Sequence, residues 1–74
     1  MEYRVEFKKK ANKTWKMWDI VGVPGTDNKN MVIDILKTTI DLSNTLEWED
    51  NNYEWRAIVL NNQDTSEDKE LKIK

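Results

Sequence analysis

The sequence has one stretch with helical periodicity, and it lies between stretches in which apolar and polar residues alternate. On a helical wheel, residues 28–44 place their apolar side chains within one arc of about 200°, which predicts an amphipathic helix. Thr26 or Asp27 is the predicted N-cap, because either side chain can accept a hydrogen bond from a free amide of the first turn. One helix covers only one face of a sheet, and this limit constrains the fold.

Three segments alternate with the two-residue period of a half-buried strand. Residues 2–8 and 14–21 are separated by a polar loop of about 4–5 residues, which predicts a hairpin. Residues 53–60 are the third predicted strand, and residues 46–49 are a candidate for a further short one.

The order of these segments predicts an α+β fold of ββαβ(β) type. We expect an antiparallel sheet of three to four strands with the amphipathic helix packed on one face. Residues 1–60 form the predicted mini-domain, and residues 61–74 a polar tail that is either disordered or ends in a weak edge strand over 69–74. The 74 residues include no cysteine, so stability must come from packing or self-association.

The alternation also assigns each strand residue to one face of the sheet. The predicted core is Tyr3, Val5, Phe7, Trp15, Met17, Val32, Ile35, Leu36, Ile40, Tyr53, Trp55, Ala57 and Val59. The predicted opposite face is Arg4, Glu6, Lys16, Trp18, Ile20, Arg56, Ile58 and Leu60. Because no second helix covers this face, its large apolar side chains indicate an interaction surface.

The residue types needed for catalysis are scarce. Histidine and cysteine are absent, and neither Ser43 nor Ser66 has a recognisable base, so we expect no enzyme and no catalytic residue. Two glycines are too few for a phosphate cradle, so no cofactor is expected. The spacing of Asp50, Asn52 and Glu54 imitates a calcium loop, but Trp55 stands where glycine is needed, so no metal site is expected.

Partner binding is the predicted function. Tryptophan and arginine are enriched at binding hot spots, and Trp18 is the predicted centre of the contact. The predicted contact residues are Trp18, Arg4, Lys16, Ile20, Arg56 and Ile58 on the sheet, and Glu47, Glu49 and Asp50 after the helix. Three alternatives stay open: a bulge that shifts the alternation and buries Trp18, a final strand and tail that fold over this face, and a homodimer through the same face.

Charge is unevenly distributed along the chain. Residues 1–25 hold six basic and three acidic side chains, whereas the net charge of the whole chain is −2. The acidic total argues against duplex binding, but the lysines and Trp15 of the first hairpin keep nucleic acid as an alternative partner. In that alternative the lysines contact phosphates while Trp18 stacks on a base. The charged N-terminus and the absence of an 18-residue apolar run predict a cytoplasmic protein with no membrane partner.

A resemblance extends over residues 2–60. The segments that carry the resemblance are Tyr3-Arg4-Val5-Glu6-Phe7, Lys13 to Trp18, a capped helix, and Tyr53 to Val59. In these segments the chain resembles small ββαβ proteins of unknown function from phages and prophages. The resemblance implies a phage-type accessory protein that modulates or inhibits a host factor. It assigns no site residue.

Overall fold

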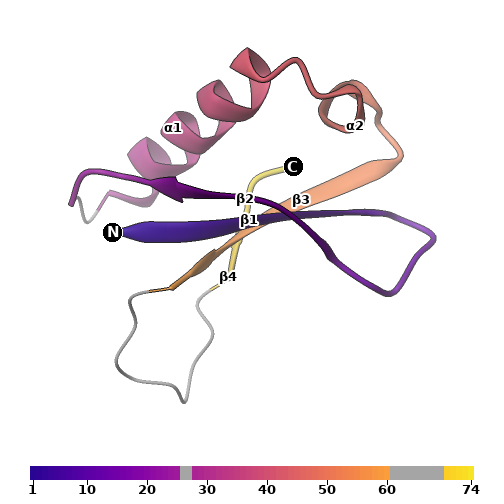
Figure 1. Cartoon of the computed structure of the whole chain (residues 1–74), viewed down its shortest axis with the longest axis horizontal. Helices are drawn as coiled ribbons and strands as arrows, with labels where there is room; N and C mark the ends of the chain where they lie inside the picture. Colours follow the sequence, from indigo (N-terminus) through magenta and orange to yellow (C-terminus); the bar gives the residue numbers. More distant parts are fainter. Residues whose placement is uncertain (26–27, 61–69) are drawn as a thin grey trace.

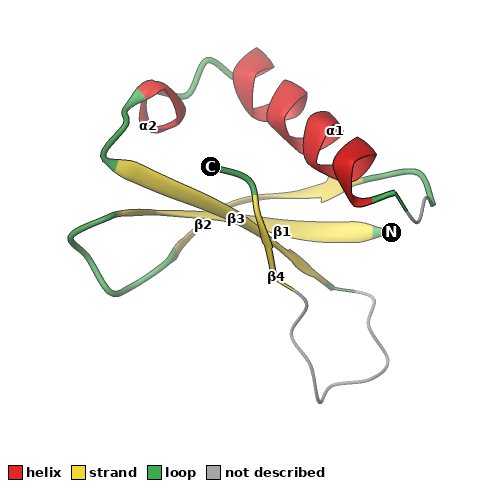
Figure 2. Ribbon diagram, turned by 180° about the vertical axis from the view of Figure 1, so that it is seen from behind, coloured by secondary structure: helices red, strands yellow, loops and turns green. Residues whose placement is uncertain are grey.

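The computed structural model describes residues 1–25, 28–60 and 70–74. The elements follow in the order β1 (Glu2–Lys9), β2 (Lys16–Gly22), α1 (Lys29–Leu42), α2 (Leu46–Glu49), β3 (Tyr53–Val59) and β4 (Glu70–Lys72). The strands form one antiparallel sheet in the order β2-β1-β3-β4. Both helices lie on the same side of it (Figure 1), as the view from behind also shows (Figure 2). The predicted α+β class, a four-stranded antiparallel sheet with one main helix, is confirmed.

The end of the chain adds the fourth strand. Of the two alternatives for the tail, the structure has the edge strand, because β4 pairs with β3. Beyond β4, the Ile73 side chain is buried, and the Trp55 amide donates to the carbonyl oxygen of Lys74 at 2.8 Å. Residues 70–74 therefore pack as part of the domain. Residues 61–69, the rest of the predicted tail, lie outside the described residues.

The long helix begins one residue later than its predicted start. Asn28 is the N-cap, and its side chain accepts from the amides of Asn30 and Met31; the two residues predicted for this role lie outside the described residues. A buried stripe one turn apart, Val32, Leu36 and Ile40, packs α1 on the sheet. The helix ends at the Ser43 C-cap, and Asn44 follows with φ 54°, a left-handed conformation that asparagine tolerates.

Residues 46–49 form the short helix α2, so their prediction as a strand is wrong. The Asp50 amide donates to the Leu46 carbonyl oxygen, which closes one helical turn. Trp48 lies edge-on to Trp55 with ring centroids 5.5 Å apart, and the Lys74 ammonium donates to the Trp48 carbonyl oxygen. Four residues are too few for periodicity to separate a strand from a helical turn.

A β-bulge in the first hairpin corrects the predicted faces. Val5 pairs with Asp19 and Glu6 pairs with Met17, so the register shifts and Trp18 is the extra residue of β2. Trp18 packs edge-on against Trp55 at 6.0 Å, whereas Met17 is 60% exposed. The placement of Trp18 on the uncovered face is therefore wrong, and so is the placement of Met17 in the core.

The core is centred on Trp55, which is completely buried. Phe7 stacks on its ring at 5.1 Å, while Trp18 and Trp48 meet it edge-on. The buried cluster is Tyr3, Val5, Val23, Val32, Leu36, Ile40, Trp55, Ala57 and Ile73. Its members Val23 and Ile73 were not predicted, because each lies beyond the end of a strand.

Candidate functional site

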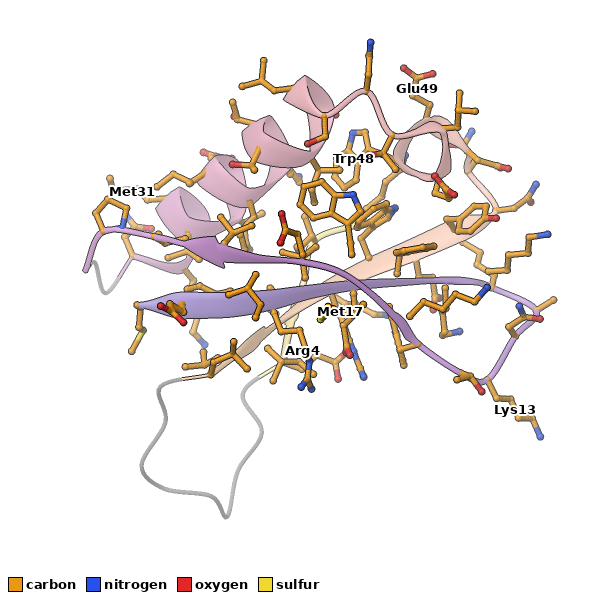
Figure 3. The ribbon with its side chains drawn as sticks, viewed as in Figure 1. Arg4, Lys13, Met17, Met31, Trp48 and Glu49 are labelled. Carbon is orange, nitrogen blue, oxygen red and sulfur yellow. The ribbon has the colours of Figure 1, made fainter. Side chains whose placement is uncertain are left out.

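The sheet face away from the helices, here called the open face, carries a chain of ion pairs. Arg56 contacts Glu6 at 2.8 Å and Glu70 at 3.4 Å. Arg4 Nε lies 3.2 Å from the other Glu6 oxygen without the geometry of a hydrogen bond. Figure 3 shows Arg4 and Met17 on this side of the sheet. Arg4, Glu6 and Arg56 therefore lie on the face where the alternation places them, and their ion pairs occupy its middle.

Trp15 lies over this network. The Arg56 guanidinium stands 4.1 Å from the centroid of the Trp15 ring, and the Lys8 ammonium stands 5.3 Å from it. Cation–π contacts at these distances stabilise the charges locally. Trp15 and Arg56 are thus engaged within the domain, and the prediction of Trp15 in the core is wrong.

A separate ion pair closes the hairpin end of the open face. Lys8 Nζ lies 3.0 Å from Glu54 Oε2 and also donates to the Asn12 carbonyl oxygen. The Lys8 hydrogen bond lowers the pKa of Glu54 below its ordinary value. Lys8 therefore has a structural role and is not available for a ligand.

The junction of the two helices carries two leucines that contact little of the core. Leu42, the last residue of α1, is 82% exposed, and Leu46, the first residue of α2, is 79% exposed. They stand on either side of the turn at residues 43–45. Single exposed leucines are common on protein surfaces, and two that flank one three-residue turn make a candidate contact site. We call Leu42 and Leu46, with the carboxylates around them, the leucine corner.

Four carboxylates surround the two leucines in the sequence: Asp41, Glu47, Glu49 and Asp50. Within the described residues, none of them forms an ion pair. Glu49 points away from the domain in Figure 3, whereas its neighbour Trp48 points toward the sheet. The leucine corner therefore combines two exposed leucines with carboxylates that are their neighbours in the sequence.

Next to α2, whose Glu47 lines it, the structure has a hollow of about 210 Å³. Its lining is Phe7, Lys8, Lys9, Asn12, Thr14, Lys16, Glu47 and Tyr53. The Phe7 and Tyr53 rings, 6.0 Å apart, are half-buried here. We call it the lysine hollow, because lysine is its most frequent lining residue.

The predicted contact residues do not form one site. Trp18 is in the core, Ile58 is buried on the open face at 8% exposure, and Arg4 and Arg56 belong to the ion-pair chain. Ile20 remains exposed on the open face, as predicted. Lys16 pairs with Phe7 and lines the lysine hollow, so its predicted face is wrong. Glu47, Glu49 and Asp50 do lie together, in α2 and at its C-cap.

Leu42 and Leu46 were missed as candidate contact residues. Leu42 falls at the border of the broad apolar arc of the helix, and Leu46 reads as the start of a strand. Only the narrow buried stripe seen in α1 shows that Leu42 lies outside the packed side of the helix.

Within the described ranges, no three acidic side chains gather closely enough to hold a metal ion. No helix in the described part of the chain is long and apolar enough to cross a membrane. Comparisons with protein-family models, with curated proteins and with solved structures found no match.

Proposed function

We propose that this chain is a non-enzymatic protein-binding module that uses the leucine corner as its contact surface. The observation that carries the proposal is the pair of leucines, both about four-fifths exposed, at the two ends of one short turn. Transfer of a leucine side chain out of water contributes about 1.5–3 kcal/mol, and the domain itself does not use this free energy here. A partner with an apolar depression would gain it.

The charge around the leucines selects the kind of partner. Four carboxylates without ion pairs in the described residues create a negative rim, which attracts a basic surface and repels an acidic one. The partner we propose is therefore a protein with an apolar pocket bordered by lysine or arginine. A phage-type accessory protein acting on a host factor in the cytoplasm is the biological setting that we propose from the sequence resemblance.

Affinity capture tests this proposal. The bait is the purified chain, the extract comes from host cells, and the variant is Leu42→Ala/Leu46→Ala. The control is Met31→Ala, because Met31 is 52% exposed on the same helix but at its other end. A protein held by wild type and by the control, and lost with the double variant, would support the proposal.

Binding of the captured protein is then measured with purified components. We expect the double variant to bind at least about tenfold more weakly, which corresponds to about 1.4 kcal/mol. Both leucines are too exposed for the change to affect folding by more than about 0.5 kcal/mol, as circular dichroism would verify. Equal affinities for wild type and the double variant would refute the proposal, and so would capture of the same proteins by all three baits.

A further inference from the structure

The lysine hollow combines positive charge with aromatic rings, which the leucine corner does not. We propose that it binds single-stranded nucleic acid, with one base against the aromatic rings and the phosphates on the lysines around them. The proposal rests on Phe7, Lys9, Lys16 and Tyr53 and does not depend on the proposed function; Glu47 borders both places.

Strand register brings the two kinds of side chain together. Phe7 pairs with Lys16 of β2, and Lys9 pairs with Tyr53 of β3, so each aromatic ring has a lysine beside it on the same face. The Lys9 ammonium stands 6.0 Å from the centroid of the Tyr53 ring. The Tyr53 ring is half-buried, and positive charge next to an accessible aromatic ring is how single-strand binders hold a phosphate while a base stacks.

The aromatic rings are held by the core beneath them. Phe7 stacks on the fully buried Trp55 at 5.1 Å, and Tyr53 tilts by 45° against Phe7. A base that lands on these rings meets side chains that are already ordered, so little conformational entropy is lost on binding.

The volume of the hollow fits one unit of a polymeric ligand better than a whole small molecule. Pockets for whole small molecules have volumes of about 300–1,000 Å³, and this hollow has about 210 Å³. Lys10 and Lys13 continue the positive charge past the hollow along the hairpin loop, and Figure 3 shows Lys13 projecting from the loop. Lys9, Lys10, Lys13 and Lys16 make no ion pair within the described residues. A single-stranded nucleic acid with one nucleotide in the hollow and further phosphates on the hairpin loop fits this arrangement.

The acidic side chains nearby favour a single strand over a duplex. Glu47 lines the hollow from α2, and the net charge of the chain is −2, so a wide and densely charged duplex meets repulsion around the lysines. An acidic protein would use the lysines but would gain nothing specific from the aromatic rings. The combination in the hollow therefore favours a flexible strand with exposed bases.

Fluorescence anisotropy with a labelled 15-nucleotide oligothymidylate tests the proposal. The variant is Lys9→Gln/Lys16→Gln, and the matched control is Lys29→Gln/Lys37→Gln, which removes the same charge from α1. We expect the hollow variant to bind at least about tenfold more weakly than the control. The slope of log K against log salt should fall by about 1.4, since each phosphate contact on a single strand contributes about 0.7.

Glu47 gives a test in the opposite direction. Glu47→Gln removes a negative charge from the lining and should tighten binding, whereas Glu49→Gln, outside the lining, should change it less. Leu42→Ala/Leu46→Ala should leave oligonucleotide affinity unchanged, so failure here and failure of the leucine corner are distinguishable. The proposal is overturned if the oligonucleotide does not bind at low salt, or if both lysine variants weaken binding equally. It is equally overturned if a duplex or polyglutamate of the same charge competes as well as the single strand.

Discussion

Replacement of Trp18 by alanine should destabilise the domain strongly, because the bulge in β2 turns this side chain toward the core. Trp18 is mostly buried and meets Trp55 edge-on at 6.0 Å. Without the bulge, strict alternation would place the same indole on the open face, where its loss would cost little. The Trp18→Ala variant therefore separates the two arrangements.

The expected loss of unfolding free energy follows from the area that Trp18 buries and from its ring contact with Trp55. A fully buried tryptophan buries about 150–250 Å². Trp18 keeps part of its surface exposed, so a burial of about 125 Å², at about 25 cal/mol per Å², contributes about 3 kcal/mol. The edge-on pair with Trp55 adds about 0.5–1.5 kcal/mol. Since a domain of this length has a total stability of about 4–11 kcal/mol, Trp18→Ala should remove about 3.5–4.5 kcal/mol, a large share of it.

Urea unfolding followed by circular dichroism measures this loss. Met17→Ala is the matched control, since Met17 is the adjacent residue and lies exposed on the open face. We expect the control to change the free energy of unfolding by less than about 0.5 kcal/mol. A loss below about 1 kcal/mol for Trp18→Ala, or equal losses for both variants, would refute the bulged register.

Three further predictions concern the chain end, an ion pair and self-association. Ile73→Ala should cost about 2–4 kcal/mol of unfolding free energy, because Ile73 is buried beside Trp55; a negligible loss in urea titration would show that the chain end does not pack. Glu54→Gln should lower the thermal midpoint at pH 7, because the ionised carboxylate pairs with Lys8 in the folded state. A carboxyl group with a lowered folded-state pKa stabilises the fold only while it is ionised, so the difference from wild type should vanish as the pH falls through that pKa. A difference independent of pH would contradict the role of the Lys8 pair. A homodimer through the open face stays a prediction: light scattering at high micromolar concentration should show a dimer that Ile20→Lys converts to monomer, and a wild-type monomer would exclude it.

The periodic features of the sequence were sufficient to predict most of the fold. The stripe of Val32, Leu36 and Ile40 and the alternation of residues 2–8 and 53–60 each repeat several times, so one irregular residue does not obscure them. A bulge, in contrast, is one inserted residue. Nothing local to Trp18 shows that it is the extra one, because only the pairing of β2 with β1 defines the insertion.

The candidate sites were harder to predict, because each depends on packing between distant segments. The lysines of the first hairpin are visible in the sequence, but the aromatic rings beside them come from Phe7 and from Tyr53, a residue far along the chain. Trp18, the ring that the sequence offered for stacking, is used by the core. The acidic residues after α1 were recognised as a contact stretch, whereas the exposure of Leu42 and Leu46 became visible only with the helix ends in place.

NMR mapping of the bound surface tests the proposed contact most directly. The 15N-labelled chain is titrated with the partner identified by affinity capture, and the amide shifts are followed residue by residue. Binding at the leucine corner predicts that the largest shifts fall within residues 41–50, while the amides of β2 and of the open face move little. Shifts centred on Arg4, Ile20 and Arg56 with residues 41–50 unmoved would contradict the proposal and return the contact to the open face of the sheet.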